Sequence, residues 1–245
     1  MRINKWGEIL MSEITECMRA ELFSRGAVLV GFGDLSAIPE DIREGLPVGI
    51  SVAVKYPKEV IRGISQLPTA EYHQWYCTLN EKLDAIVTHG AQFLRSKGFR
   101  AVERTRQRVN FDDSKTEYQT DLPHKTVATR AGIGWIGKCA MLVTEEYGSM
   151  VRLSSILTDA PIDCAVPVDK SRCGECTVCV EACPAKAVSG KLWHAGLARE
   201  EFFDAIACEK TAKERSRLGF GGTETICGKC IEVCPYTKSY LNRAD

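Results

Sequence analysis

Hydrophobic residues recur at helical spacing in two long stretches of the chain. Residues 5–23 carry apolar side chains every three or four positions, and residues 70–97 repeat the pattern over a longer span. This periodicity is typical of helices with one buried face. We therefore predict a helix over 5–23 and either one long helix or two consecutive helices over 70–97. Cys17 and Cys77 lie within these stretches and are predicted to be packing residues.

Short apolar runs predict the strands. Residues 27–33 and 49–56 are continuous enough to be strands buried on both faces. Further strands are expected over 99–104, 139–144 and 150–157. Helices and strands mix without strict βαβ alternation, which favours an α+β layered domain.

Polar and glycine-rich segments separate these elements. Residues 108–123 are predicted to form a loop that can carry function. A short helix is expected at 124–131, followed by a glycine loop over 132–138. We place the end of the α+β domain in the connecting stretch near residue 165, so that the two domains are 1–165 and 166–245.

Eight of the twelve cysteines form two iron–sulfur motifs. The first run has the spacing C-x2-C-x2-C-x3-C-P, which is typical of bacterial two-cluster ferredoxins. The second run ends in the same way, but its first cysteine stands 19 residues before the next one. The predicted ligands are, in chain order, Cys173, Cys176, Cys179, Cys183, Cys208, Cys227, Cys230 and Cys234.

The last cysteine of each run is expected to ligate the other cluster, as in two-cluster ferredoxins. The first 4Fe–4S cluster is then predicted to take Cys173, Cys176, Cys179 and Cys234. The second cluster is predicted to take Cys183, Cys208, Cys227 and Cys230. The segment between Cys208 and Cys227 is therefore an insertion that returns to the second cluster.

Zinc and disulfides are the alternatives for these cysteines. Paired C-x2-C motifs also make structural zinc sites, and eight cysteines could hold two ions. The three-cysteine run and the prolines Pro184 and Pro235 favour iron–sulfur clusters. Disulfides are not expected, because no secretory signal precedes the first helical pattern. No apolar stretch approaches the roughly 20 residues that span a bilayer, so we expect a cytoplasmic protein without membrane contact.

Composition and charge exclude few classes of function. The 245 residues are 44% hydrophobic and 26% charged, as in ordinary globular proteins of one large or two small domains. The formal net charge is zero, which gives no support for nucleic-acid binding. A dense basic run between Arg95 and Arg108 is expected to be a solvated face, with substrate or partner binding as the alternative.

The glycine loop contains the spacing of a dinucleotide fingerprint. Gly132, Gly134 and Gly137 match G-x-G-x-x-G. In a Rossmann unit a strand precedes this loop and a helix follows it. Here the expected order is reversed, so a flavin or nicotinamide enzyme is the least favoured hypothesis.

The order of motifs resembles that of epoxyqueuosine reductases. The segments that carry the resemblance are Arg130–Lys138 (RAGIGWIGK), Tyr147-Gly-Ser, Leu157–Pro161 (LTDAP) and the two cysteine runs. Enzymes of this family depend on cobalamin, carry two 4Fe–4S clusters and are related to reductive dehalogenases. The resemblance implies a nitroreductase-like α+β cofactor domain followed by a two-cluster ferredoxin-like module.

The resemblance also implies a set of cofactor contacts. Glycines would let the backbone approach a flat macrocycle closely, and Trp135 would pack against it. The residues expected to bind cobalamin are His124, Lys125, Arg130, Gly132, Gly134, Trp135, Gly137 and Lys138.

Asp121 is the expected proton donor, as the nearest match to an acidic residue that precedes the glycine loop in the family. A carboxyl group in an apolar pocket has a raised pKa and can donate a proton. Asp112, Asp113 and Tyr118 are rivals, and a plain helix N-cap is the alternative role of Asp121. Family members often have asparagine where this chain has Cys139, which is expected to be a packed strand residue or a reactive thiol.

These features together predict an iron–sulfur reductase. Low-potential electrons from a ferredoxin or flavodoxin would pass through the clusters to cobalt, which would reduce an electrophilic substrate. The substrate stays open, and tRNA is possible although the net charge does not favour it. The alternative is a ferredoxin-like electron-transfer protein, or a reductive activator of a corrinoid protein, without its own cobalamin.

Overall fold

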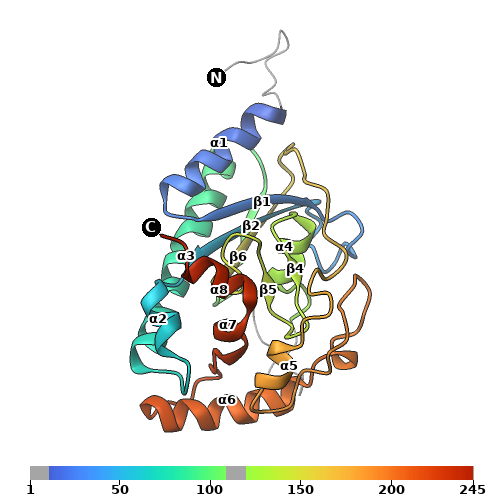
Figure 1. The fold of residues 1–245 in the computed structure, drawn as a ribbon. Helices are drawn as coiled ribbons and strands as arrows, with labels where there is room; N and C mark the ends of the chain where they lie inside the picture. Colours follow the sequence, from blue (N-terminus) through green and yellow to red (C-terminus); the bar gives the residue numbers. More distant parts are fainter. Residues whose placement is uncertain (1–10, 109–119, 245) are drawn as a thin grey trace.

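A four-stranded antiparallel sheet forms the centre of the molecule in a computed structural model (Figure 1). The structure describes residues 11–108 and 120–244, so Asp112, Asp113 and Tyr118 lie outside the described residues. The strands lie in the order β1-β2-β6-β3. Their bounds are β1 Leu29–Asp34, β2 Val48–Lys55, β3 Ala101–Glu103 and β6 Val151–Thr158. The predicted α+β class and these four strands are confirmed.

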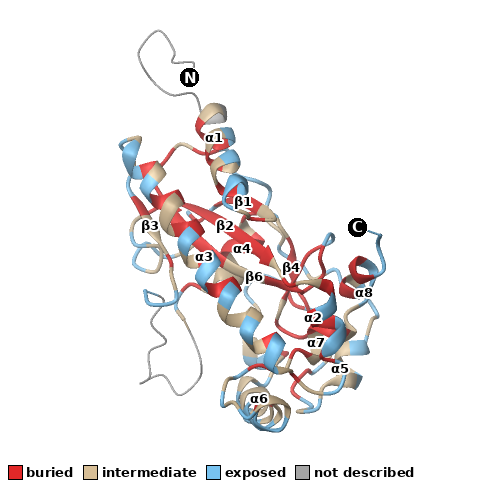
Figure 2. Cartoon of the chain, turned by 90° about the vertical axis from the view of Figure 1, so that its left-hand side faces the viewer, coloured by how far each residue is buried: buried red, intermediate tan, exposed pale blue. Residues whose placement is uncertain are grey.

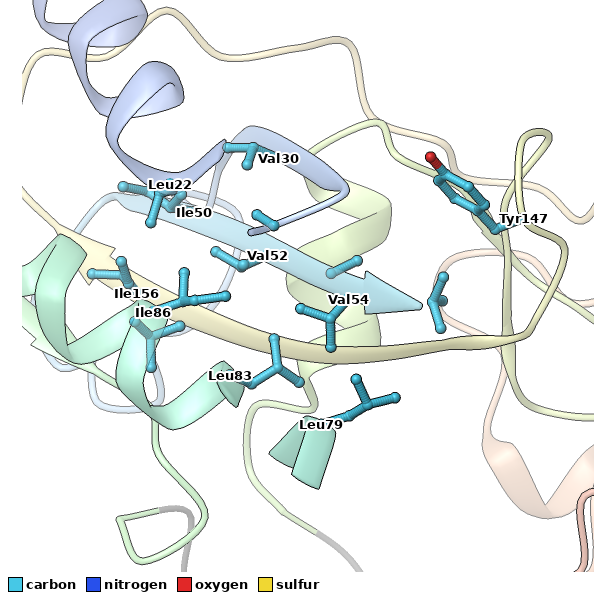
Figure 3. Packing of buried hydrophobic residues seen from close by; sticks show 14 of the residues in the cluster. Leu22, Val30, Ile50, Val52, Val54, Leu79, Leu83, Ile86, Tyr147 and Ile156 are labelled. Carbon is cyan, nitrogen blue, oxygen red and sulfur yellow. The ribbon is translucent and has the colours of Figure 1, made fainter. Parts of the chain in front are cut away.

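Helices cover both faces of this sheet. On one face lie α1 (Met11–Ser24) and α3 (Ala70–Ser96), and on the other lies α4 (His124–Arg130). Central strand β2 is buried along seven of its eight residues, which explains its continuous apolar sequence (Figure 2). Figure 3 shows Leu83 and Ile86 of α3 packed over the sheet beside Ile156.

Residues 70–97 form one helix, not two. Helix α3 runs without a break for 27 residues. Its N-cap residue Thr69 accepts a hydrogen bond from the amide of Tyr72 at 3.1 Å, which satisfies one of the free donors of the first turn. Despite this length α3 is amphipathic, and within the described ranges no helix is apolar enough to cross a membrane.

Glycines in β1 allow α4 to approach the sheet very closely. A Cβ atom at Gly31 would lie 2.5 Å from the carbonyl oxygen of Ala131, and one at Gly33 would lie 2.5 Å from the carbonyl carbon of Arg130. No side chain fits at either distance. The glycines therefore bring the end of α4 and the start of the glycine loop directly against β1.

The glycine loop contributes a short strand, which the hydrophobic pattern did not predict, to a small hairpin. Strand β4 (Trp135–Ile136) pairs with β5 (Leu142–Val143). The predicted strand over 139–144 was therefore wrong in its first half. Residues 137–140 form a turn in which the amide of Ala140 donates to the carbonyl of Gly137 at 2.9 Å.

The C-terminal part wraps around one end of the sheet and is mostly loops and short helices (Figure 1). Its elements are α5 Val178–Ala182, η1 Arg199–Glu201, α6 Ala205–Phe220, α7 Lys229–Val233 and α8 Pro235–Leu241. Helix α2 (Lys58–Gly63) contacts α7. The insertion between Cys208 and Cys227 consists largely of α6, which carries Cys208 in its first turn.

One hydrophobic core joins this part to the sheet. Ile231 of α7 and Tyr240 of α8 belong to the same buried cluster as Val52 and Ile156. The turn before β6 also touches α8, because the amide of Ser149 donates to Thr237 Oγ1 at 3.1 Å. The cysteine motifs are thus held against the sheet by apolar packing as well as by the chain itself.

Replacement of Gly148 by alanine is expected to break this contact. A Cβ atom there would lie 2.2 Å from the backbone nitrogen of Thr237, and Gly148 has a φ of +57°. We expect the free energy of unfolding to fall by at least about 3 kcal/mol, from strain and overpacking together. Anaerobic denaturant titration measures this loss.

The matched control is Gly98→Ala. Gly98 also has a positive φ, +90°, but a Cβ atom added there would meet no other atom within 4 Å. Only backbone strain of about 1–2 kcal/mol is expected there. Equal losses for the two variants would contradict the proposed contact between the turn and α8.

Candidate functional site

The predicted cluster ligands lie in two groups. Burial raises the pKa of Cys208 to about 11, and neighbouring Cys227 and Cys183 add to this shift. Burial also raises the pKa of Cys234, with a contribution from Cys173. Each group therefore contains a cysteine from the other run, which is the exchange expected of a two-cluster fold.

A cavity of about 830 Å³ opens among the cysteines of the first group. Its lining includes Cys173, Cys176, Cys179 and Cys234. Cys230, which is predicted to ligate the second cluster, also borders this cavity. All twelve thiols are free, and in the part of the chain that the structure describes no three His, Cys, Asp or Glu side chains converge as a single metal ion would require.

Residues 138–142 separate this cysteine cavity from a second region of open space. Lys138 is buried, and its Nζ donates to the carbonyl oxygen of Cys176 at 2.9 Å. The buried thiol of Cys139 lies between the sulfurs of Cys179 and Cys230. Cys139 therefore belongs to the turn, not to a strand, and it faces the predicted ligands.

The other side of this segment faces α4. The carbonyl oxygen of Ala140 accepts a hydrogen bond from Lys125 Nζ at 2.9 Å. Ala140 has a φ of +60°, which is uncommon for a residue with a side chain and is typical of constrained functional turns. A single turn thus connects the cysteine cavity to the space around Lys125.

Two adjoining cavities surround Lys125, with volumes of about 900 and 1010 Å³ when the space open to solvent is included. They share Thr120, Pro123 and Lys125. The smaller one extends to Trp193 and Phe202 in the segment between the two cysteine runs. The larger one is lined by His124, Lys125, Ala140 and side chains of α3 and β6.

Burial dominates the electrostatics of His124 and Lys125. Burial, together with the charges of Arg104 and Arg152, lowers the pKa of His124 to about 4. It also lowers the pKa of Lys125 to about 8, with Arg199 contributing in the same direction. At pH 7 His124 is therefore neutral, and its Nδ1 lies 2.9 Å from Ser155 Oγ.

At the glycines that are predicted to contact the cofactor, other atoms of the protein occupy the space where a side chain would lie. A Cβ atom at Gly134 would lie 2.3 Å from the carbonyl oxygen of Val143, and one at Gly137 would lie 2.9 Å from Val143 Cγ2. At Gly132 the nearest atom is Ala165 Cβ, at 3.1 Å. These glycines serve the packing of the hairpin, and contact with a cofactor stays a prediction.

Arg130 and Trp135 also make contacts within the protein. Arg130 donates to the carbonyl oxygen of Asp34 at 3.3 Å and pairs with Asp169 at 3.1 Å. Trp135 is only 1% exposed and packs edge-on against Tyr236 of α8, with ring centroids 4.9 Å apart. Both residues join the glycine loop to its neighbours and line neither cavity around Lys125.

Asp121 is exposed and lies just before α4. The N-cap of α4 is Pro123 without a side-chain cap, so the alternative role of Asp121 as an N-cap is wrong. Its charge acts on Arg104, which donates to the carbonyl oxygen of Leu122 at 3.1 Å. Neighbouring Thr120 lines both cavities, whereas Asp121 lines neither.

Sequence reasoning missed Asn80 and Arg152. Both line the larger cavity, and Arg152 donates to Asn80 Oδ1 through Nε at 3.1 Å and Nη2 at 2.8 Å. A signal existed for Asn80, because it occupies a buried position of α3 four residues after Tyr76 and three before Leu83. A polar amide in such an apolar stripe needs a partner.

A pH-dependent stability is expected from His124. Below its usual pKa near 6.5 the unfolded chain takes up a proton that the folded chain resists until about pH 4. The free energy of unfolding therefore falls as the pH decreases from 6.5 to 4, by about 2–3 kcal/mol. Replacement by glutamine should remove this part of the pH dependence, as measured by denaturant titration at pH 7 and pH 5.

His194 supplies the control for this measurement. It is exposed, and its Nδ1 lies 2.9 Å from the neighbouring carbonyl oxygen of Ala195. His194→Gln should leave the difference between pH 7 and pH 5 unchanged. A His124→Gln variant with the pH dependence of the parent chain would show that His124 is not buried in its neutral form.

Comparison with known proteins gives a family model and a set of relatives. The model for a 4Fe–4S double cluster binding domain matches residues 172–237. Epoxyqueuosine reductase of Bacillus subtilis is 31% identical over 173 residues, which are 69% of this chain and 38% of the relative. That of Aliivibrio fischeri is 25% identical over 210 residues, 84% of this chain and 54% of the relative. The chain thus spans about a third to a half of the length of these curated relatives.

Solved structures agree on the fold. An epoxyqueuosine reductase in complex with an epoxyqueuosine-modified tRNA-Tyr stem loop matches 93% of this chain and 66% of that chain, with a TM-score of 0.60 and 22% identity. A reductive dehalogenase described as B12-dependent matches 99% of this chain and 34% of that chain, with a TM-score of 0.70 and 18% identity. The predicted resemblance is therefore confirmed: the chain is similar to epoxyqueuosine reductases in sequence and shares a fold with them and with reductive dehalogenases.

Proposed function

We propose that the chain is a cobalamin-dependent iron–sulfur reductase of the epoxyqueuosine reductase type. The observation that carries the proposal is the position of residues 138–142. One side of this segment contacts the predicted cluster ligands through Lys138 and Cys139, and the other side lines the cavity around Lys125. A cofactor in that cavity would receive electrons from the first cluster across a single turn of chain.

The larger cavity and the one beside it together offer space for a corrinoid and a substrate. The larger cavity shares Thr120, Pro123 and Lys125 with its neighbour, so a ligand bigger than either one can extend across both. Met141, Leu142, Val151 and Leu153 give the larger cavity apolar walls. His124, Lys125 and the backbone at Ala140 would hold the amide side chains of the macrocycle. A corrinoid bound there supplies the strong reductant that acts on an electrophilic substrate.

Residues of the chain itself would hold the first cluster in place and supply protons. Lys138 fixes the loop of Cys176 through its hydrogen bond to the carbonyl, so the first cluster would be held rigidly. Lys125, with a pKa of about 8, is protonated at pH 7 and can donate a proton into either cavity. Asp121 remains the proposed acid from the resemblance, and it follows Thr120, which lines both cavities.

The remaining assignments follow from this function. We propose a nitroreductase-like domain over residues 1–165 and a ferredoxin-like domain over 166–245, acting in the cytoplasm with a ferredoxin or flavodoxin as donor. An epoxyqueuosine-modified tRNA is one candidate substrate, because a relative is described with such a stem loop. Since the chain spans only part of its relatives, a different electrophilic substrate is equally compatible with the site.

Metal analysis of anaerobically purified protein, supplied with hydroxocobalamin, tests the proposal. We expect about eight irons and eight sulfides in two four-iron clusters, plus one cobalt per chain. Eight irons without cobalt would overturn the reductase assignment and support the alternative, an electron-transfer protein or an activator of a corrinoid protein. A bound flavin spectrum would instead support a flavin oxidoreductase.

Paired cysteine substitutions are expected to reveal which ligands share a cluster. The double variant Cys176→Ser/Cys234→Ser removes two ligands of the first cluster only, so about four irons per chain should remain. Cys176→Ser/Cys183→Ser removes one ligand from each cluster, so neither cluster should stay intact. Iron analysis and low-temperature electron paramagnetic resonance distinguish the two results.

Cys164→Ser is the control, because Cys164 is exposed, its thiol donates to the carbonyl of Ile162 at 3.6 Å, and it is not a predicted ligand. It should retain about eight irons. The reverse result, one intact cluster in Cys176→Ser/Cys183→Ser and none in Cys176→Ser/Cys234→Ser, would mean that the ligands are not exchanged between the runs.

A further inference from the structure

Arg152 is a cation without a carboxylate partner among the described residues. It projects from β6 into the larger cavity, where both Nε and Nη2 donate to Asn80 Oδ1. Its guanidinium lies 4.3 Å from the ring centroid of Tyr76, which supports it from one side. The guanidinium is thus fixed in orientation by neutral groups and keeps its full charge for a ligand.

Asn80 carries an unsatisfied donor in the same wall. Arginine can only donate hydrogen bonds, so the atom of Asn80 that it contacts must be the oxygen. The amide nitrogen Nδ2 is then the remaining atom. It is buried and has no partner among residues 11–108 and 120–244, and Asn80 itself is 3% exposed and lines the cavity. A buried donor of this kind is stable only when an acceptor meets it.

The charged side chains that line this cavity, as far as the structure describes them, all have the same sign. Arg106, Lys125 and Arg152 line it, and none of its described lining residues is acidic. Arg106 is paired with Asp84 at 3.5 Å, so Lys125 and Arg152 provide most of the positive field. The low pKa of His124, to which the charges of Arg104 and Arg152 contribute, agrees with such a field.

Apolar side chains face these donors. Met141, Leu142, Val151 and Leu153 line the same cavity. The wall therefore combines a fixed guanidinium and an amide N–H with a hydrophobic surface. This combination suits an acceptor group attached to an apolar body.

We propose that Arg152 and Asn80 form an anion-binding subsite that takes a carboxylate or phosphate group of the substrate, with the apolar part of the substrate against Met141 and Leu153. Placing the substrate in this cavity rests on the proposed reductase function. Binding of the anion itself needs neither electrons nor cobalt, so it can be tested separately.

Isothermal titration of anaerobic, cluster-loaded protein tests the subsite. The probes are benzoate, phenyl phosphate and neutral benzamide, which share one apolar ring. We expect benzoate or phenyl phosphate to bind at least tenfold more tightly than benzamide, and the better of the two identifies the anion. Equal affinities for all three probes, or no binding by protein with intact clusters, would overturn the proposal.

Two variants test the named residues. Arg152→Gln removes the charge, and Asn80→Asp supplies a carboxylate that pairs with Arg152 inside the protein. Both should weaken anion binding at least tenfold, and Asn80→Asp should do so without lowering the melting temperature. Arg217→Gln, on the exposed face of α6, is the control and should bind like the parent chain. Parent-like anion affinity in both cavity variants would overturn the assignment.

Protein loaded with hydroxocobalamin separates the two sources of the anion. If the probes still bind to the cobalamin-loaded protein, the subsite serves a substrate. If cobalamin abolishes anion binding, the group that Arg152 holds is the phosphate of the corrinoid, and the substrate assignment is overturned. If the protein takes up no cobalamin but still binds the anions, the anion-binding subsite is supported and only the reductase function is overturned.

Discussion

The structure depends on backbone approaching backbone at positions where only glycine fits. Gly31 and Gly33 let the end of α4 lie against β1, and Gly148 lets the turn before β6 lie against α8. Contacts this close leave little freedom for either partner, because protein interiors are packed as densely as organic crystals. They fix the two ends of the region that contains the glycine loop, and so they determine where residues 138–142 lie.

Residues 138–142 are the meeting point of the two halves. Lys138 and Cys139 face the cysteine runs, while Ala140 accepts a hydrogen bond from Lys125 and Met141 lines the cavity. Such a short connection suits electron transfer between a cluster and a second cofactor. The same geometry explains why the left-handed conformation of Ala140 is tolerated, since hydrogen bonds and packing on both sides hold it.

Charge is distributed unevenly although it sums to zero. Lysine and arginine balance aspartate and glutamate, with 32 residues of each sign. In the larger cavity, however, three cations gather without any acidic side chain among the described lining residues. Net charge is a statement about the surface as a whole, whereas recognition depends on the field inside one cavity. An uncharged chain can therefore contain a strongly cationic site.

The sequence by itself determined the class of the fold, the main helices and strands, and the two cysteine motifs. Local periodicity and fixed ligand spacing are properties of neighbouring residues, so they survive without knowledge of the fold. Only the tertiary structure decided that the glycines serve internal packing and that Trp135 lies against α8. It also decided that Asn80 contacts Arg152, which lies 72 positions further along the sequence. These facts depend on which distant backbones touch, and contacts of that kind leave no periodic signal in one sequence.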